Sequence, residues 1–154
     1  MDDLIIIREL IKHFPLQKGF LDRLFAKEKG FVRAVDGVSF TIKKGEVLGL
    51  VGESGCGKTT TGRLILRLVE PSSGDILYNG KSVFSFTKKE MEKMREKMQI
   101  VFQDPYASLS PRMSIGKAIE HPLVIHNSHN KAKRKETCLR IMEKVGLEPA
   151  NFLY

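Results

Sequence analysis

The stretch LVGESGCGKTTT, residues 50–61, contains the spacing G-x-x-x-x-G-K-[ST] at Gly52, Gly57, Lys58 and Thr59. Glycines permit the tight backbone conformations that let N–H groups surround phosphate oxygens at close range. A lysine at this spacing reaches the outer phosphates as a point charge, and the following threonine hydroxyl can bind magnesium. The stretch therefore predicts a loop that holds phosphates and Mg²⁺.

The flanking residues support this prediction. EVLGLVG, residues 46–52, is a continuous apolar run and predicts a strand that is buried on both faces. KTTTGRLILRL, residues 58–68, places Leu64, Ile65 and Leu68 at helical spacing, so a helix should point its positive end at the phosphates. Cys56 stands inside the loop as a small side chain that fits there, the alternative being a redox-sensing thiol.

The remaining pattern predicts alternating strands and helices. LIIIREL (4–10) and FVRAVDGVSFTI (31–42) predict strands, and residues 12–31 an irregular or partly helical insertion. DILYNGKSV (75–83) predicts a hairpin, because Asn-Gly favours a tight turn. Thr87 and Glu90 form a predicted capping box before a helix over residues 88–98, in which Met91, Met94 and Met98 should be core residues.

Further along, MQIVFQ (98–103) predicts a short core strand that ends at Gln103, and residues 104–113 a loop. We expect Ser114 to cap a helix that runs to about Ile119, and a last helix over residues 131–145 that Gly146 closes. This order predicts a mixed α/β core with an antiparallel β patch and a helical extension.

The composition excludes several classes of protein. The chain has 154 residues with 42% hydrophobic content, which favours one domain or most of one and argues against disorder. No apolar run approaches the roughly 20 residues of a membrane helix, and the N-terminus is a poor signal peptide. We expect the two cysteines to be reduced thiols and His121, His126 and His129 to be exposed loop residues rather than a metal site. The net charge of +8 alone would allow a nucleic-acid-binding protein, but the motifs argue against one.

Several spaced motifs carry a resemblance to one family. GESGCGKTT (52–60) resembles the phosphate loop of ABC transporter ATPases, SGDILYNGK (73–81) their antiparallel β region, and IVFQDPYASLSPRMSIGKAI (100–119) their Q-loop. Within that family, KHFP (12–15) with its insertion, AVDGVSF (34–40) and QDPYASLSPRM (103–113) resemble the ATPase subunits of oligopeptide and dipeptide importers. The resemblance covers nearly the whole chain.

The resemblance implies an α/β fold: a P-loop NTPase core of the RecA-like type, with an antiparallel β subdomain and part of a helical subdomain, incomplete at the C-terminus. The implied division is residues 1–86 for the β subdomain and phosphate loop, 87–113 for a helix, core strand and Q-loop, and 114–154 for the start of the helical subdomain.

The resemblance also implies ATP and Mg²⁺ as cofactors. Gln103 would approach the magnesium and the attacking water, as a catalytic residue and a metal ligand beside Thr59. An aromatic ring stacks on adenine in this family. Phe14 is the candidate for this ring, and Phe20 and Phe31 are its rivals. The ordinary alternative is that Phe14 only packs in the core. The residues implied to hold the nucleotide are Phe14, Gly52, Glu53, Ser54, Gly55, Cys56, Gly57, Lys58, Thr59 and Thr60.

The family's signature motif L-S-G-G-Q, its apolar strand ending in Asp-Glu and its switch histidine have no match among these 154 residues. We therefore expect this chain to bind MgATP weakly at best, without appreciable turnover on its own. The implied partners are transmembrane permease subunits and a second ATPase subunit, identical or not, with no nucleic acid. The implied location is cytoplasmic, peripheral on the inner face of the cell membrane. The alternative hypothesis is a non-hydrolytic nucleotide-binding or regulatory module that docks on a membrane partner.

Overall fold

The computed structural model describes residues 2–16, 30–104, 109–126 and 130–153. The chain forms two compact units, Met1–Gln99 and Ile100–Tyr154. The three-part division expected from the sequence stays a prediction, because compactness alone does not test the boundaries of subdomains.

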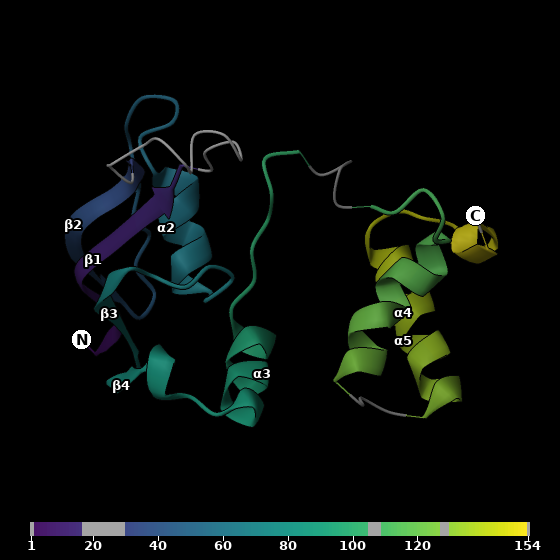
Figure 1. Cartoon of the computed structure of the whole chain (residues 1–154). Helices are drawn as coiled ribbons and strands as arrows, with labels where there is room; N and C mark the ends of the chain where they lie inside the picture. The colour runs from purple at the N-terminus through teal and green to yellow at the C-terminus, as the bar shows by residue number, and fades with distance from the viewer. Residues whose placement is uncertain (1, 17–29, 105–108, 127–129, 154) are drawn as a thin grey trace. The chain divides into compact units, whose positions relative to one another are not determined.

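The first unit is built on a four-stranded antiparallel sheet (Figure 1). Its strands are β1 (Asp3–Pro15), β2 (Phe31–Lys43), β3 (Ser73–Tyr78) and β4 (Lys81–Ser82), in the order β2-β1-β3-β4. The strands predicted over residues 4–10 and 31–42 are confirmed. The insertion between them lies mostly outside the described residues, but β1 and β2 continue into it as a ribbon in which Pro15 pairs with Phe31.

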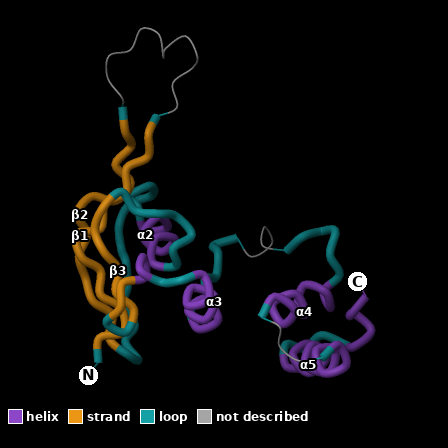
Figure 2. The backbone as a smooth tube through the Cα atoms, turned by 60° about the horizontal axis from the view of Figure 1, so that its bottom comes forward, coloured by secondary structure: helices purple, strands orange, loops and turns teal. Residues whose placement is uncertain are grey.

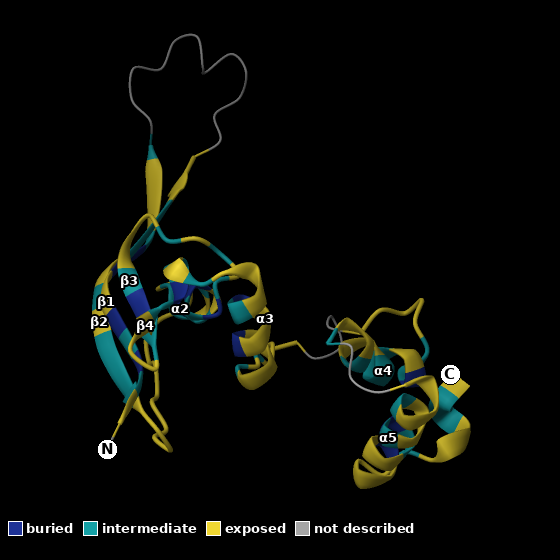
Figure 3. Cartoon of the chain, turned by 90° about the horizontal axis from the view of Figure 1, so that it is seen from below, coloured by how far each residue is buried: buried dark blue, intermediate teal, exposed yellow. Residues whose placement is uncertain are grey.

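One face of this sheet carries the core. Helix α2 (Lys58–Ile65) and helix α3 (Lys88–Lys97) lie on the same side of the strands (Figure 2). Side chains at alternate positions of β1 point toward them, as the pleat of a strand requires. Figure 3 shows the buried residues between the two layers. The core consists of Ile5, Ile7, Leu10, Val35, Leu64, Ile76, Val83, Met91 and Met94.

The predicted hairpin and capping box are both confirmed. Asn79 and Gly80 have φ values of 48° and 78°, as a tight hairpin turn with two left-handed residues requires. After a short 3₁₀ helix, η1 (Val83–Ser85), the Thr87 hydroxyl accepts from the backbone N–H of Glu90, whose carboxylate accepts from the backbone N–H of Thr87. Because both N-terminal donors are satisfied, α3 begins at Lys88.

The two core strands predicted from apolar runs are wrong for this structure. Residues 46–52 and 98–103 lie outside the helices and strands, and Val47 and Val51 are each 97% exposed. A strand buried on both faces needs neighbouring strands and covering layers. Among the residues that the structure describes, β-pairing involves only β1 to β4, so these runs have no partner strand there.

Helix α2 ends at Ile65 rather than at Leu68, the last residue predicted for it. Arg67 takes a left-handed conformation with φ 48°, and the Leu68 N–H donates to the Arg63 carbonyl at 2.8 Å. This is a Schellman ending, usually made by glycine. Contacts fix the arginine there: Nε donates to Glu70 at 2.9 Å and Nη1 to the Val83 carbonyl at 3.1 Å.

The second unit holds helices α4 (Ile115–Ile125) and α5 (Lys131–Lys144) and the 3₁₀ segment η3 (Pro149–Leu153). Cys138 and Met142 of α5 are fully buried, and Arg134 forms an ion pair with Glu120 of α4 at 3.0 Å. Ser114 caps α4 and Gly146, with φ 75°, follows α5, as predicted.

Helix α4 is longer than predicted and contains His121 and Pro122. The expectation that His121 is a loop residue is therefore wrong, although the side chain is exposed as expected. His126 caps the end of α4, and His129 lies outside the described residues. No helix in the described ranges combines the length and apolar character needed to cross a bilayer.

Candidate phosphate-binding site

The loop of residues 52–57 joins the segment 46–51, which lies outside the helices and strands, to α2. Gly55 and Gly57 have φ values of 82° and 96°, in the region that favours glycine. The Cys56 N–H donates to the Glu53 carbonyl at 3.3 Å, which closes a tight turn. Gly57 then serves as the N-cap of α2 without a side chain to satisfy the helix donors. The local sequence thus produces a curled backbone that leads directly into a helix N-terminus.

The loop rests on β2. A Cβ built on Gly57 would lie 2.1 Å from the Ala34 carbonyl oxygen, so no side chain fits between the two backbones. Because Ala34 belongs to the β1–β2 ribbon, this contact fixes the start of α2 against the sheet. The sequence pattern requires glycine at this position, but it gives no indication of the strand that the glycine approaches.

Lys58 is held by its own loop. Its Nζ donates to the carbonyl oxygens of Gly52 at 2.7 Å and Glu53 at 2.6 Å. An ammonium has three donors, and the third faces the Cys56 Sγ at 3.4 Å, which is a weak acceptor. The loop therefore positions one positive charge at its centre and leaves one donor for a stronger acceptor.

The N-terminus of α2 adds backbone donors. Thr61 makes the first N–H bond of the helix, to the Gly57 carbonyl at 2.8 Å, so the amides before it have no partner within the helix. The first turn contains no acidic residue, and the buried Thr61 hydroxyl also donates to Gly57 at 3.0 Å. Unpaired amides and the positive end of the helix dipole favour an anion beside Lys58.

Thr59 and Thr60 take different positions at this helix start. Thr59 is exposed, so its hydroxyl is accessible from solvent beside the loop, whereas Thr60 is half-buried. A hydroxyl next to phosphate oxygens is a suitable oxygen ligand for Mg²⁺, which binds through few protein groups and keeps several waters. The donor set of the loop thus fits a magnesium-bound phosphate chain.

Two of the three candidate rings for adenine lie on β1 and β2, the strand pair that the loop contacts at Ala34. Phe14 pairs with Val32, which precedes Ala34 by two positions on β2. Phe31 pairs with Pro15 at the next position along β2, further from Ala34. Neither ring belongs to the core: Phe14 is 38% and Phe31 53% exposed. Lys12 Nζ lies 4.9 Å from the centre of the Phe14 ring. Phe20 lies outside the described residues, so the choice among the three stays open.

Gln103 belongs to the second unit and is exposed, outside any helix or strand. Its predicted role beside magnesium and water therefore stays a prediction. The described residues contain no cluster of three or more histidine, cysteine or acidic side chains that could hold a metal. Cys56 is exposed and Cys138 is buried, and burial raises the pKa of the Cys138 thiol.

Comparison with known proteins agrees with this geometry. The family model described as "ABC transporter" matches residues 35–152. The oligopeptide transport ATP-binding protein AppF of Bacillus subtilis (strain 168) is 42% identical over 150 residues, which cover 97% of this chain and 44% of that protein. The dipeptide transport ATP-binding protein DppF of Escherichia coli (strain K12) is 43% identical over 144 residues, which cover 94% of this chain and 42% of that protein. The chain thus spans less than half the length of these relatives.

Solved structures share the fold. A dimeric ATP-binding cassette in a post-hydrolysis state, bound to ADP and phosphate, superposes with a TM-score of 0.71 at 22% identity, covering 98% of this chain and 61% of that one. CbiO1 of Clostridium perfringens, part of an ABC transporter complex, gives a TM-score of 0.64 at 25% identity, covering 96% and 52%. These likenesses confirm the predicted fold class.

Proposed function

Because the chain belongs to the ATP-binding proteins of the ABC transporter family, we propose that residues 52–60 hold the phosphates of ATP. The chain would serve as the nucleotide-binding part of the energy-coupling ATPase of an importer for oligopeptides or dipeptides. The names of the similar proteins support a peptide substrate, since AppF and DppF are described as oligopeptide and dipeptide transport proteins.

The observation that carries this proposal is the position of Lys58. Its ammonium is fixed by two carbonyl oxygens of the loop, 2.7 and 2.6 Å away, at the N-terminus of α2. A phosphate oxygen at this place would accept hydrogen bonds from the remaining N–H of the ammonium and from the backbone amides at the start of the helix. The site offers positive charge and donors that are already in position, which is what a phosphate chain requires.

The remaining residues receive roles that depend on the family. The Thr59 hydroxyl would bind Mg²⁺, which neutralises charge on the phosphates when bound. Phe14 would stack on adenine, and Gln103 would orient the attacking water. Phosphoryl transfer also needs a residue that activates this water, and these 154 residues contain no match to the family's Asp-Glu strand. We therefore expect nucleotide binding without turnover by this chain alone.

The partners follow from the same proposal. The ATPase would pair with a second ATPase subunit and with transmembrane permeases, and through them would lie on the inner face of the membrane. The dimeric state of the solved cassette supports the first pairing. Co-purification of the chain with co-expressed permease subunits would test the pairing with the permeases.

Equilibrium binding of MgATP tests the central claim. The wild-type chain should bind the nucleotide, and Lys58→Ala should weaken binding by at least about tenfold, since it removes the charge at the centre of the loop. Lys89→Ala is the matched control, because it removes the same charge from an exposed position on α3. Equal affinity of the wild type and Lys58→Ala would refute the proposal. Phosphate release above the Lys58→Ala background would refute the expected lack of turnover.

A further inference from the structure

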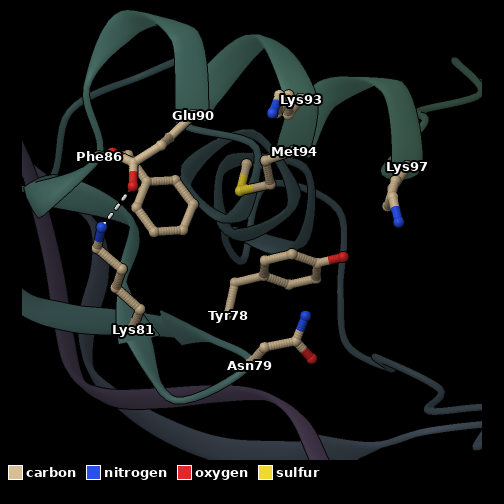
Figure 4. Close-up of a pocket in the computed structure, with 8 residues that line it drawn as sticks. All are labelled: Tyr78, Asn79, Lys81, Phe86, Glu90, Lys93, Met94 and Lys97. Atoms are coloured by element: carbon tan, nitrogen blue, oxygen red, sulfur yellow. Dashed lines mark hydrogen bonds and ion pairs between the residues drawn. The ribbon is translucent and has the colours of Figure 1, made fainter.

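A second pocket lies in the first unit, between the β3–β4 hairpin and α3. We call it the hairpin groove (Figure 4). Its volume of about 330 Å³ lies at the lower end of the range of small-molecule sites. Its lining comes from the end of β3, the hairpin turn, the segment before α3 and one face of α3. None of these residues belongs to the phosphate loop.

The floor of the hairpin groove is apolar and aromatic. Tyr78, at the end of β3, and Phe86, just before α3, are half-buried, and Met94 of α3 is buried. Figure 4 shows the two rings on either side of the Met94 thioether, between the hairpin and the helix. Aromatic rings and a thioether offer a surface on which a planar ring packs well.

One side of the groove is closed by an ion pair. Lys81 of β4 donates to the Glu90 carboxylate of α3 at 2.6 Å, and its Nζ lies 5.3 Å from the centre of the Phe86 ring. The hydrogen bond from Lys81, with those from Thr87, lowers the pKa of Glu90 to about 2. The carboxylate is therefore ionised at neutral pH and already occupied by donors of its own capping box and of Lys81.

Beyond Glu90, the rim formed by α3 carries two further charges that no ion pair neutralises within the described residues. Lys93 and Lys97 stand four residues apart on α3, so both project from the face of the helix that lines the groove. Within the described residues, neither ammonium makes an ion pair or a side-chain hydrogen bond. The Asn79 amide, in the hairpin turn, adds a polar group at the rim. The rim thus has an excess of positive charge over an aromatic floor.

We propose that the hairpin groove binds a small molecule that joins a planar ring to an acidic group, either a carboxylate or a phosphate. The ring would pack against Tyr78 and Phe86, and the acidic group would be bound by Lys93 and Lys97. Either half alone would bind weakly, because exposed charges give little affinity in water and the apolar floor is small. The two halves together explain why an apolar floor and free ammonium groups occur in one pocket.

The test uses 2-naphthoate as the ring with an acid, 2-naphthol as the ring alone and acetate as the acid alone. The chain is labelled with ¹³C at the methionine methyl groups. Met94 reports on the groove, and Met142, which is buried in the second unit, is the internal reference. We expect millimolar 2-naphthoate to shift the Met94 signal in a saturable manner, and 2-naphthol and acetate to have much weaker effects.

Matched variants separate recognition from simple partitioning into an apolar pocket. K93Q/K97Q should raise the dissociation constant of 2-naphthoate about fivefold, as the loss of two exposed charge contacts predicts. K88Q/K89Q removes the same charge from the first turn of α3, outside the groove. This control should leave the dissociation constant of 2-naphthoate unchanged. Lys58→Ala should also leave the dissociation constant of 2-naphthoate unchanged, which distinguishes the hairpin groove from the phosphate loop.

Three results would overturn the proposal. The first is a Met94 signal that does not respond to 2-naphthoate. The second is equal binding of 2-naphthoate and 2-naphthol, which would indicate an apolar cavity without recognition of the acid. The third is equal weakening by K93Q/K97Q and K88Q/K89Q, which would indicate a general effect of net charge. Thermal unfolding of each variant checks that the fold is retained.

Discussion

The backbones of Gly57 and Ala34 meet so closely that a methyl group on Gly57 would lie 2.1 Å from the Ala34 carbonyl oxygen. The phosphate loop and the β1–β2 ribbon are thereby joined at one close backbone contact. Phe14 pairs with Val32 on the same ribbon, close to Ala34 in sequence. The proposed adenine contact and the proposed phosphate contacts therefore depend on the same packing.

Gly57→Ala should disrupt this contact. The new methyl group clashes with backbone, and a φ of 96° is strained for any residue with a Cβ. We expect the free energy of unfolding to fall by about 2–3 kcal/mol, measured by urea denaturation, together with weaker MgATP binding. Gly55→Ala is the control, since φ is 82° but nothing lies within 4 Å of its added Cβ. A Gly57→Ala chain no less stable than Gly55→Ala would contradict the packing.

Thr59→Val tests the proposed magnesium ligand. Valine keeps the shape of threonine but lacks the hydroxyl oxygen, so the metal would lose a ligand while the loop backbone stays in place. We expect the affinity for MgATP to fall on the order of tenfold and the affinity for ATP in the presence of EDTA to stay unchanged. Thr59→Ser, which retains the hydroxyl, should bind like the wild type. Equal losses with and without Mg²⁺ would argue against metal binding.

Glu90 should titrate at unusually low pH. Hydrogen bonds from Lys81 and then from Thr87 lower the pKa of its carboxyl from 4.5 to about 2. Because the folded-state pKa lies below the unfolded value, this carboxylate adds stability above about pH 4.5 and loses it as the pH falls toward 2. A ¹³C NMR titration of the wild type and Lys81→Met would check this. The variant should show a higher pKa, still below 4.5 because the Thr87 bonds remain; an unchanged pKa would contradict the assignment.

Arg67 should be less tolerant of alanine than of glycine. Both substitutions remove the contacts with Glu70 and Val83, but alanine alone keeps the strain of a left-handed φ of 48°. We expect Arg67→Ala to be less stable than Arg67→Gly by about 1 kcal/mol, measured by urea denaturation of the two variants side by side. The opposite order would show that α2 ends differently in solution.

The features that the sequence predicted correctly depend on neighbouring residues. The glycine turn at Gly55 and Gly57 that leads into α2, the Asn79-Gly80 turn and the capping box of Thr87 and Glu90 are each complete within a few residues of chain. Propensity and hydrogen-bond geometry therefore suffice to predict them.

The failures concern distant contacts. The apolar run of residues 46–52 predicts a buried strand, but burial requires neighbouring strands that the run itself does not contain. Val47 and Val51 are exposed. Arg67 ends α2 through Val83, a residue far along the chain that no periodicity reveals. Similarly, the approach of Gly57 to Ala34 and the pairing of Lys81 with Glu90 at one side of the hairpin groove require the folded structure.

The two carbonyl contacts of Lys58 have a consequence for the entropy of binding. A free lysine side chain loses up to about 2 kcal/mol of rotamer entropy when it is immobilised. In this loop the Gly52 and Glu53 carbonyls already restrict the side chain, so that loss accompanies folding rather than the arrival of a ligand. An incoming phosphate would then meet a cation whose disorder has been removed beforehand. Changes that loosen the loop would therefore reduce affinity through entropy, even with the lysine itself intact.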